Sequence, residues 1–296
     1  MADEPGPSEP GPGEPGPGEP GTGEPGTGQP DPAAPPDVDT RRANVARVYD
    51  YWLGGTRNFQ ADQDLGRQIM AVEPNVRAIA RANRAFLGRA VRVLAEAGIR
   101  QFLDIGSGIP TQGNVHEVAQ AVDPSIRVVY ADIDPVAVAY SQAILSHNPN
   151  AAAIQADLRD PPAILADDTI RRLIDFSRPA GLLLVSVLHF IPDADQPRQL
   201  VATLRDALAP GSYLVLCHAA EAGPITAQPL EKVYNQSVSA SLRIRSGPEI
   251  WPFFDGFEVL DPGLVSGPQW RPDPAAVARG EAGHMWGLLA GVGRKP

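Results

Sequence analysis

The stretch Phe102–Thr111, FLDIGSGIPT, decides which fold this chain can adopt. Two apolar residues lead into a carboxylate at Asp104, and two glycines, Gly106 and Gly108, follow with one residue between them. This pattern is typical of a buried strand that ends in a sharp turn, after which a helix directs its N-terminus at a ligand. Glycine leaves the backbone open to that ligand and accepts a positive φ without strain.

The turn differs from a dinucleotide-binding turn in two respects. The pattern GxGxxG needs a third glycine or an alanine, and this chain has Thr111 at that position. Asp104 also stands directly before the turn, where a carboxylate suits a cationic ligand and repels a pyrophosphate. These differences point away from NAD and toward S-adenosylmethionine.

Apolar runs and helical patterns alternate on both sides of this turn. We expect strands at 99–105, 127–131, 152–156, 181–188 and 213–217, and antiparallel strands near the C-terminus at 257–260 and 286–292. We expect helices at 45–52, 74–98, 114–122, 168–176, 196–208, 229–240 and 248–254. This alternation predicts a doubly wound, Rossmann-like α/β fold with right-handed crossovers and a C-terminal antiparallel hairpin.

Composition divides the chain into three parts. Residues 4–28 are five tandem acidic pentapeptides rich in Pro and Gly, so we expect a disordered tail over 1–38. A helical cap follows over 39–98, and the ligand-binding domain covers 99–296. The net charge of −10 comes largely from residues 1–40, which hold nine acids and no Lys or Arg, so the rest of the chain has no basic excess to attract nucleic acid.

The cap begins with the stretch 40–59, TRRANVARVYDYWLGGTRNF. Its polar and aromatic residues cluster around the turn Gly54–Gly55, which ends the first helix. Two interpretations stay open: the cluster lines the site as a lid, or it is ordinary core. We expect the arginines of the following helix to form a solvated face; they are Arg77, Arg81, Arg84, Arg89 and Arg92.

Acids also stand at the ends of the second and third predicted strands. Asp132 lies where doubly wound folds hold a ribose diol. Asp134, followed by Pro135, has instead the pattern of a helix N-cap with proline at the first helical position. Asp157 and Leu158 could bind the adenine amino group and cover the ring, although a loop cap is an equal alternative.

The strand at 181–188 is followed by the best candidate for a general base. His189 ends this buried run at the ligand side and titrates near neutrality, although a packed or capping histidine is the alternative. His218 holds a similar place after the fifth strand. No cluster of Cys and His indicates a metal, so we expect none. The single cysteine, the acidic N-terminus and the absence of a long apolar run favour a cytoplasmic protein that enters no membrane.

Several motifs together carry a family resemblance. VYDYWLGGTRNF, FLDIGSGIPT, VVYADIDP, ADLRDP and SVLHFIPD resemble the actinobacterial S-adenosylmethionine-dependent methyltransferase family once known as DUF574. The resemblance runs from about Thr40 to the C-terminus. It implies the class I methyltransferase fold, with a seven-stranded mixed sheet, and S-adenosylmethionine as the cofactor.

The resemblance also implies roles for particular residues. Those expected to bind the cofactor through the strand ends are Asp104, Gly106, Ser107, Gly108, Asp132, Ile133, Asp157, Leu158 and Ser186. Apart from the resemblance, the polar groups around the Gly54–Gly55 turn lead us to expect Tyr49, Tyr51, Arg57 or Asn58 at the methionine moiety or the acceptor, and His189 and Tyr51 are the candidate catalytic residues.

The sequence therefore predicts an enzyme that transfers a methyl group from S-adenosylmethionine to an unidentified, small-molecule acceptor, without nucleic acid or membrane as a partner. A non-catalytic S-adenosylmethionine sensor or scaffold is the alternative, and Thr111 disfavours an NAD-linked oxidoreductase. Neither the acceptor nor the oligomeric state follows from the sequence.

Overall fold

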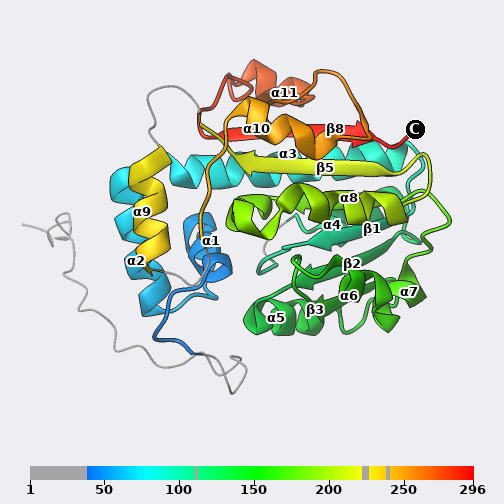
Figure 1. Ribbon diagram of the computed structural model, residues 1–296, viewed down its shortest axis with the longest axis horizontal. Helices are drawn as coiled ribbons and strands as arrows, with labels where there is room; N and C mark the ends of the chain where they lie inside the picture. Colours follow the sequence, from blue (N-terminus) through cyan, green and yellow to red (C-terminus); the bar gives the residue numbers. More distant parts are fainter. Residues whose placement is uncertain (1–38, 111–112, 222–226, 238–240) are drawn as a thin grey trace, which may run out of the picture. The chain divides into compact units, whose positions relative to one another are not determined.

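An eight-stranded sheet organises the computed structural model, which describes residues 39–110, 113–221, 227–237 and 241–296 (Figure 1). The predicted tail over 1–38 lies outside the described residues. The strands are β1 Gln101–Ile105, β2 Arg127–Asp132, β3 Ala151–Gln155, β4 Gly181–Val185, β5 Tyr213–Ala219, β6 Glu258–Val259, β7 Val265–Ser266 and β8 Leu288–Arg294. Their order is β3-β2-β1-β4-β5-β8-β6, with β7 pairing to β8.

The strand directions confirm the predicted fold class. Strands β1 to β5 pair in parallel, whereas β8 runs antiparallel to β5, β6 and β7. Two details differ from the prediction. The two-residue strand β7 was not expected, and β4 ends at Val185 instead of continuing to Leu188, because Ser186 adopts a left-handed φ of 59° and a 3-10 turn, η1 Leu188–Phe190, follows.

Helices connect the strands and precede the first of them. They are α1 Val45–Leu53, α2 Gln60–Val72, α3 Val76–Glu96, α4 Val115–Val122, α5 Pro135–Leu145, α6 Pro161–Ala166, α7 Asp168–Leu173, α8 Pro197–Ala207, α9 Ala227–Ser237, α10 Gly247–Ile250 and α11 Pro274–Ala278. Helices α2, α6 and α11 were not predicted. Asn44 caps α1 through the Ala46 N–H, and Gly54 ends that helix with a φ of 82°, as the Gly-Gly turn predicts.

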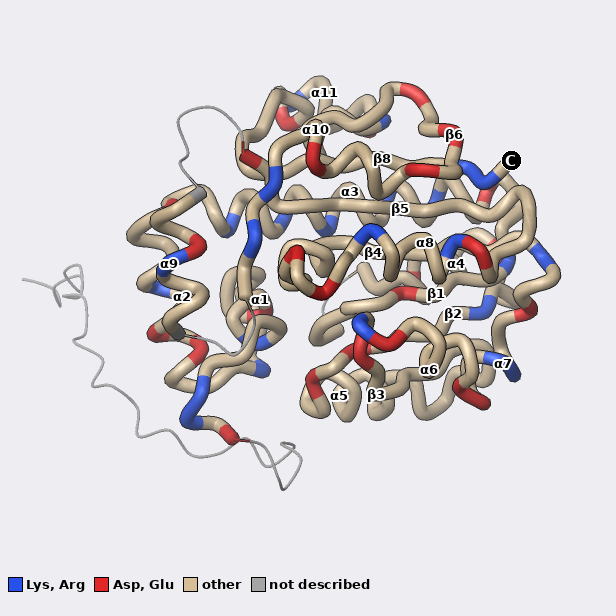
Figure 2. The backbone as a smooth tube through the Cα atoms, viewed as in Figure 1, with Lys and Arg blue, Asp and Glu red and all other residues tan. Residues whose placement is uncertain are grey.

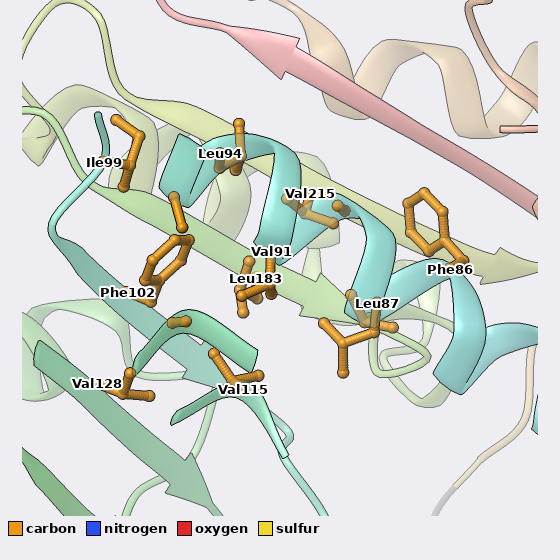
Figure 3. Close-up of a cluster of buried hydrophobic side chains, with 14 of the residues drawn as sticks. Phe86, Leu87, Val91, Leu94, Ile99, Phe102, Val115, Val128, Leu183 and Val215 are labelled. Carbon is orange, nitrogen blue, oxygen red and sulfur yellow. The ribbon is translucent and has the colours of Figure 1, made fainter. Parts of the chain in front are cut away.

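Alternate residues of each strand enter two separate cores, as the pleat of a sheet requires. Phe102 and Leu183 pack with α3 and α4 on one face, whereas Leu103 and Leu182 pack with α6, α7 and α8 on the other. Figure 3 shows the first of these cores, in which side chains of α3 lie over the strands. Burial on both faces explains why the central strands read as continuous apolar runs.

A third hydrophobic cluster lies outside the sheet. It joins α1, α2 and the start of α3 to α9, a helix from much later in the chain. We call these four helical segments the cap; α2 and α9 lie side by side in it (Figure 1). The cap therefore includes a segment from beyond 39–98, which the sequence did not predict.

Charged residues of both signs are interspersed along the described backbone (Figure 2). Among the described residues, none of the helices is long and apolar enough to cross a membrane.

A buried ion pair fastens α1 to the start of α2. The carboxylate of Asp62 lies 3.0 Å from the Arg47 Nε, and both side chains are almost fully buried. The same carboxylate accepts the N–H groups of Asn44 and Phe59, each at 2.8 Å. One side chain thus satisfies one cation and two orphan backbone donors.

Replacing Asp62 by Ala should destabilise the protein by about 3–5 kcal/mol, because it leaves the Arg47 charge buried without its partner. Urea unfolding measures the change in the free energy of unfolding. The control is Asp64→Asn, at an exposed ion pair with Arg67 on the same helix, which should cost less than about 1 kcal/mol. Equal effects of the two substitutions would contradict this assignment.

Candidate active site

A cavity of about 520 Å³ lies between the carboxyl ends of the parallel strands and the cap. Its walls come from the turns after β1, β2, β3 and β4, from the cap helices and from the segment that follows α9. Open α/β sheets bind ligands at this edge, where the strand order reverses. Here the reversal falls between β1 and β4, so topology alone places a site at the turn that the sequence singled out.

The two glycines of that turn serve different purposes. Gly106 has a φ of 75°, and a Cβ at this position would meet the Val187 side chain at 2.3 Å, so the turn packs directly on the loop after β4. Gly108 has a φ of 67°, and no atom of the described residues lies within 4 Å of the Cβ position. The backbone at Gly108 is therefore open to a ligand, whereas Gly106 is needed for packing.

Asp104 is the most electrostatically perturbed carboxyl group of the turn. It lines the cavity, yet it is only 4% exposed, and no hydrogen bond reaches its carboxyl group from the described residues. Burial raises its pKa from the ordinary 3.8 to about 7, against an opposing effect of Arg84. An uncompensated buried carboxylate of this kind favours a cationic ligand.

Asp132, at the end of β2, is held by the backbone. Its carboxylate accepts the Gly108 N–H at 2.7 Å and the Asp134 N–H at 2.9 Å. Burial raises its pKa to about 6, and these hydrogen bonds oppose the rise. Asp134 caps α5 through the Val136 N–H at 3.0 Å, which confirms the predicted N-cap. Its buried Oδ2 has no hydrogen-bond partner in the described part of the chain.

Apolar side chains and an ion pair form the next part of the wall. Ile133 lines the cavity and is 53% exposed, which is unusual for a large apolar residue, and Leu158 lies buried in the same lining. Asp157 also lines the cavity, but its carboxylate forms hydrogen bonds and an ion pair with Arg159. Part of the hydrogen-bonding capacity of Asp157 is therefore used within the protein.

Helix α3 contributes residues that the sequence analysis missed. Two arginines of α3 do not lie on the expected solvated face: Arg84 lines the cavity beside Asp104, and Arg89 donates to the Gly267 carbonyl. Arg81 and Arg92 are exposed, as expected. Asn83 also lines the cavity. The spacing of three and four residues from Ala80 to Asn83, Arg84 and Leu87 was the available signal, because it places all four on one helical face.

Tyr49 and Asn83 form a hydrogen-bond network in which one acceptor has no partner among the described residues. The Tyr49 hydroxyl donates to the Ala80 carbonyl at 2.9 Å and accepts from the Asn83 Nδ2 at 2.8 Å. This fixes the orientation of the Asn83 amide. Its Oδ1 is buried and has no hydrogen-bond partner among the described residues, so it can accept from a ligand.

His189 lines the cavity as expected, but its hydrogen bonding does not suit a general base. The Nδ1 accepts the Ala219 N–H at 3.2 Å, so the neutral ring carries its proton on Nε2. Burial, followed by the effects of His218 and Arg245, lowers its pKa well below 6.5. His189 therefore presents a hydrogen-bond donor, and neither nitrogen keeps a free lone pair.

His218 lies within β5 and is fully buried. Its Nδ1 contacts the Ala219 carbonyl at 2.6 Å and its Nε2 contacts the Arg245 guanidinium at 3.0 Å. Burial lowers its pKa to about 3. This histidine therefore acts as a structural link between β5 and the segment after α9.

Ser186 lines the cavity at the end of β4 with its left-handed backbone. A positive φ is strained for serine, and the N–H donates to the Cys217 carbonyl at 2.9 Å, which holds it in place. Ser107 lies in the same lining, in the turn after β1.

Three residues expected at the site lie elsewhere. Tyr51, Arg57 and Asn58 are not in the cavity lining. Tyr51 packs against Gly66 and under Arg77, while Arg57 and Asn58 donate to the Asp50 carboxylate through a backbone N–H at 2.9 Å and an amide at 2.8 Å. Asp50 is buried and needs these donors, so the cluster around the Gly-Gly turn folds onto itself.

The cavity as a whole is acidic. Its described lining contains six carboxyl side chains and two arginines, of which Arg159 is paired with Asp157. Within the described residues, no group of three or more His, Cys, Asp or Glu could hold a metal. An acidic cleft at the switch point of a Rossmann-like sheet suits an organic cation.

The fold, the turn and this charge balance define a methyltransferase of the class that uses S-adenosylmethionine. The chain belongs to the S-adenosyl methyltransferase family, whose model matches residues 31–296. It is an enzyme, and S-adenosylmethionine is its methyl donor.

Two crystal structures resemble the chain over nearly its whole described length. A candidate methyltransferase from Thermobifida fusca YX is 43% identical, with a TM-score of 0.80, over 88% of this chain and 98% of that one. A DUF574 family protein from Streptomyces avermitilis MA-4680 is 39% identical, with a TM-score of 0.81, over 87% and 99% of the two chains. A search of curated proteins gave no match.

Replacing Asp104 by Asn should stabilise the protein without cofactor at pH 8 by about 2–4 kcal/mol. The folded-state pKa of Asp104 is raised from 3.8 to about 7, so its contribution is most favourable below pH 3.8 and is lost as the pH rises through 7. Urea unfolding at pH 8 and at pH 5 measures the difference, which should shrink at the lower pH. A variant without this gain at pH 8 would show that the carboxylate is well solvated.

Proposed function

We propose that the enzyme methylates a small molecule that binds in the same cavity as the cofactor, between the strand ends and the cap. The observation that carries the proposal is the cavity itself. One space of about 520 Å³ reaches from Asp104 and Asp132 to the cap helices, and volumes of this order hold small organic ligands.

The residues at the strand ends fit the cofactor. Asp104 would bind the ammonium group, because its buried carboxyl has no hydrogen-bond partner among the described residues, and Arg84 beside it would bind the carboxylate. The open backbone at Gly108 leaves room for this amino acid portion. Asp132 would accept the ribose hydroxyls with its remaining lone pairs.

The apolar residues of the same wall would enclose the adenine. Ile133 is exposed to the cavity and Leu158 lies in the lining, so the ring can rest between them. Asp157 would bind the adenine amino group with the lone pairs that Arg159 does not use.

S-adenosylmethionine supplies an electrophilic methyl group on a sulfonium. The chain itself contributes alignment and exclusion of water, which the cap provides over the strand ends. His189 would orient the acceptor by donating from Nε2, and Asn83 would accept from it through Oδ1. Tyr51, Arg57 and Asn58 have no part in this proposal because they lie outside the cavity lining.

Calorimetric titration with S-adenosylhomocysteine at several pH values tests the cofactor half of this proposal. Affinity should rise by up to about tenfold per unit as the pH increases from 5 to 7, because the ionised form of Asp104 binds the ammonium. Asp104→Asn should weaken binding by about 1.5–3 kcal/mol at pH 8 and flatten the pH profile. A flat profile for the unmodified enzyme would contradict the assignment of Asp104.

Transfer of a radiolabelled methyl group from S-adenosylmethionine into a cell extract tests the acceptor class. We expect the label in the low-mass fraction, and label confined to protein or nucleic acid would contradict a small-molecule acceptor. Asp104→Asn serves as the control for enzyme-dependent labelling in the same extract.

A further inference from the structure

The cap side of the cavity has a continuous aromatic wall. Tyr49 contacts Trp52 with ring centroids 6.4 Å apart, and Trp52 contacts Tyr234 at 6.4 Å. Tyr234 contacts Phe190 at 5.9 Å, and Phe190 contacts His189 at 4.3 Å. All five rings line the cavity, although they come from α1, α9 and η1. Neighbouring rings are inclined to one another by 47° to 72°, so ring faces and ring edges alternate along the wall, and an aromatic ligand can pack against both.

Most of the remaining lining on this side is aliphatic, and Asn44, Asn83 and Ser241 are its polar members besides Glu73. The aliphatic residues include Ile69, Val76, Ile79, Ala80, Leu230, Leu242 and Ile244. Helix α3 connects this region to the strand ends. Its lining residues run from Val76 to Leu87, a distance of about 16 Å at 1.5 Å per residue.

One carboxylate lies in these apolar surroundings. Glu73 lines the cavity between α2 and α3 and is 5% exposed. Its Oε1 accepts the Asn75 N–H at 2.9 Å, while no hydrogen bond or ion pair reaches its Oε2 from the described residues. Neither arginine of the described lining pairs with Glu73: Arg84 donates to the Gly113 carbonyl and to the Asn114 Oδ1, each at 3.4 Å, and Arg159 is paired with Asp157.

A second polar group of the wall also lacks a partner. Tyr234 is 4% exposed, and its hydroxyl has no hydrogen-bond partner among the described residues. Both residues are more than nine-tenths buried and both line the cavity, so a polar ligand can supply a partner for the hydroxyl and for the carboxylate oxygen. The carboxylate sets the sign of the charge, because only a cation or a strong donor compensates it.

We propose that the acceptor is an aromatic amine, whose ring packs on the wall from Tyr49 to His189 and whose ammonium group pairs with Glu73. This inference rests on the proposed function, since it assigns the other half of the same cavity. Aromatic faces attract cations as well as rings, so the wall and the carboxylate favour the same ligand. Glu73 is thus a specificity-determining residue, and the methylated atom lies toward the strand ends.

Calorimetric titrations with defined probes, in saturating S-adenosylhomocysteine, test this inference. Tryptamine should bind at least about tenfold more tightly than indole-3-propionate, which has a carboxylate in place of the amine. The affinity of tryptamine should also exceed that of n-butylamine, which has the charge without the ring, by a similar factor. The S-adenosylhomocysteine fills the strand-end subsite, so the acids there do not contribute to the preference.

Glu73→Gln removes the charge and keeps an oxygen that can accept the Asn75 N–H, so the variant should fold. We expect it to lose about tenfold in tryptamine affinity and to keep its affinity for S-adenosylhomocysteine. Glu258→Gln, at an exposed acid outside the cavity lining, is the matched control and should change neither.

The possible outcomes separate this inference from the proposed function. Failure of S-adenosylhomocysteine to bind would contradict the proposed function. If S-adenosylhomocysteine binds normally, three results would overturn the aromatic-amine acceptor. Tryptamine would show no saturable binding at millimolar concentration, or the amine and the carboxylate would bind equally well, or Glu73→Gln would keep the preference for the amine.

Discussion

One carboxylate holds together the two turns on which the cofactor side of the cavity depends. Asp132, at the end of β2, accepts the N–H of Gly108 from the turn after β1 and the N–H of Asp134 from the start of α5. The first bond fixes the glycine turn with its open face toward the cavity. The second fixes the helix that follows Ile133, and with it the exposure of that apolar side chain. Without Asp132 these backbone donors would be buried and unpaired at the same edge.

The strand ends were predictable because topology restricts them strongly. A continuous apolar run followed by an acid or a glycine marks the carboxyl end of a buried parallel strand, and all such ends meet at one edge of the sheet. This is why Asp104, Gly108, Asp132 and Leu158, which are far apart in the sequence, were correctly expected in one lining. Their roles toward the cofactor depend on the ligand and remain predictions.

The cap was less predictable, because its geometry depends on helix phase and on pairing between distant segments. Tyr49 and Tyr51 are two residues apart on α1 and therefore face different directions: Tyr49 lines the cavity and Tyr51 packs against Gly66. Asp50 captures the donors of Arg57 and Asn58, a local interaction that composition does not reveal. Tyr234 meets Trp52 across more than 180 residues, and nothing in either segment specifies that contact.

The protonation state of His189 bears on both the cofactor side and the acceptor side of the proposed site. Burial, followed by the effects of His218 and Arg245, lowers its pKa well below 6.5, and its Nδ1 accepts the Ala219 N–H. If the cofactor binds as proposed, a neutral ring at this position avoids repulsion with the cationic sulfonium, whereas a protonated ring would weaken cofactor binding. In the proposed reaction the one histidine of the described lining is then not the base, and the acceptor would react through a lone pair that His189 does not generate. We therefore expect the rate to depend on how closely the cap aligns that lone pair with the methyl group, and not on proton abstraction by His189.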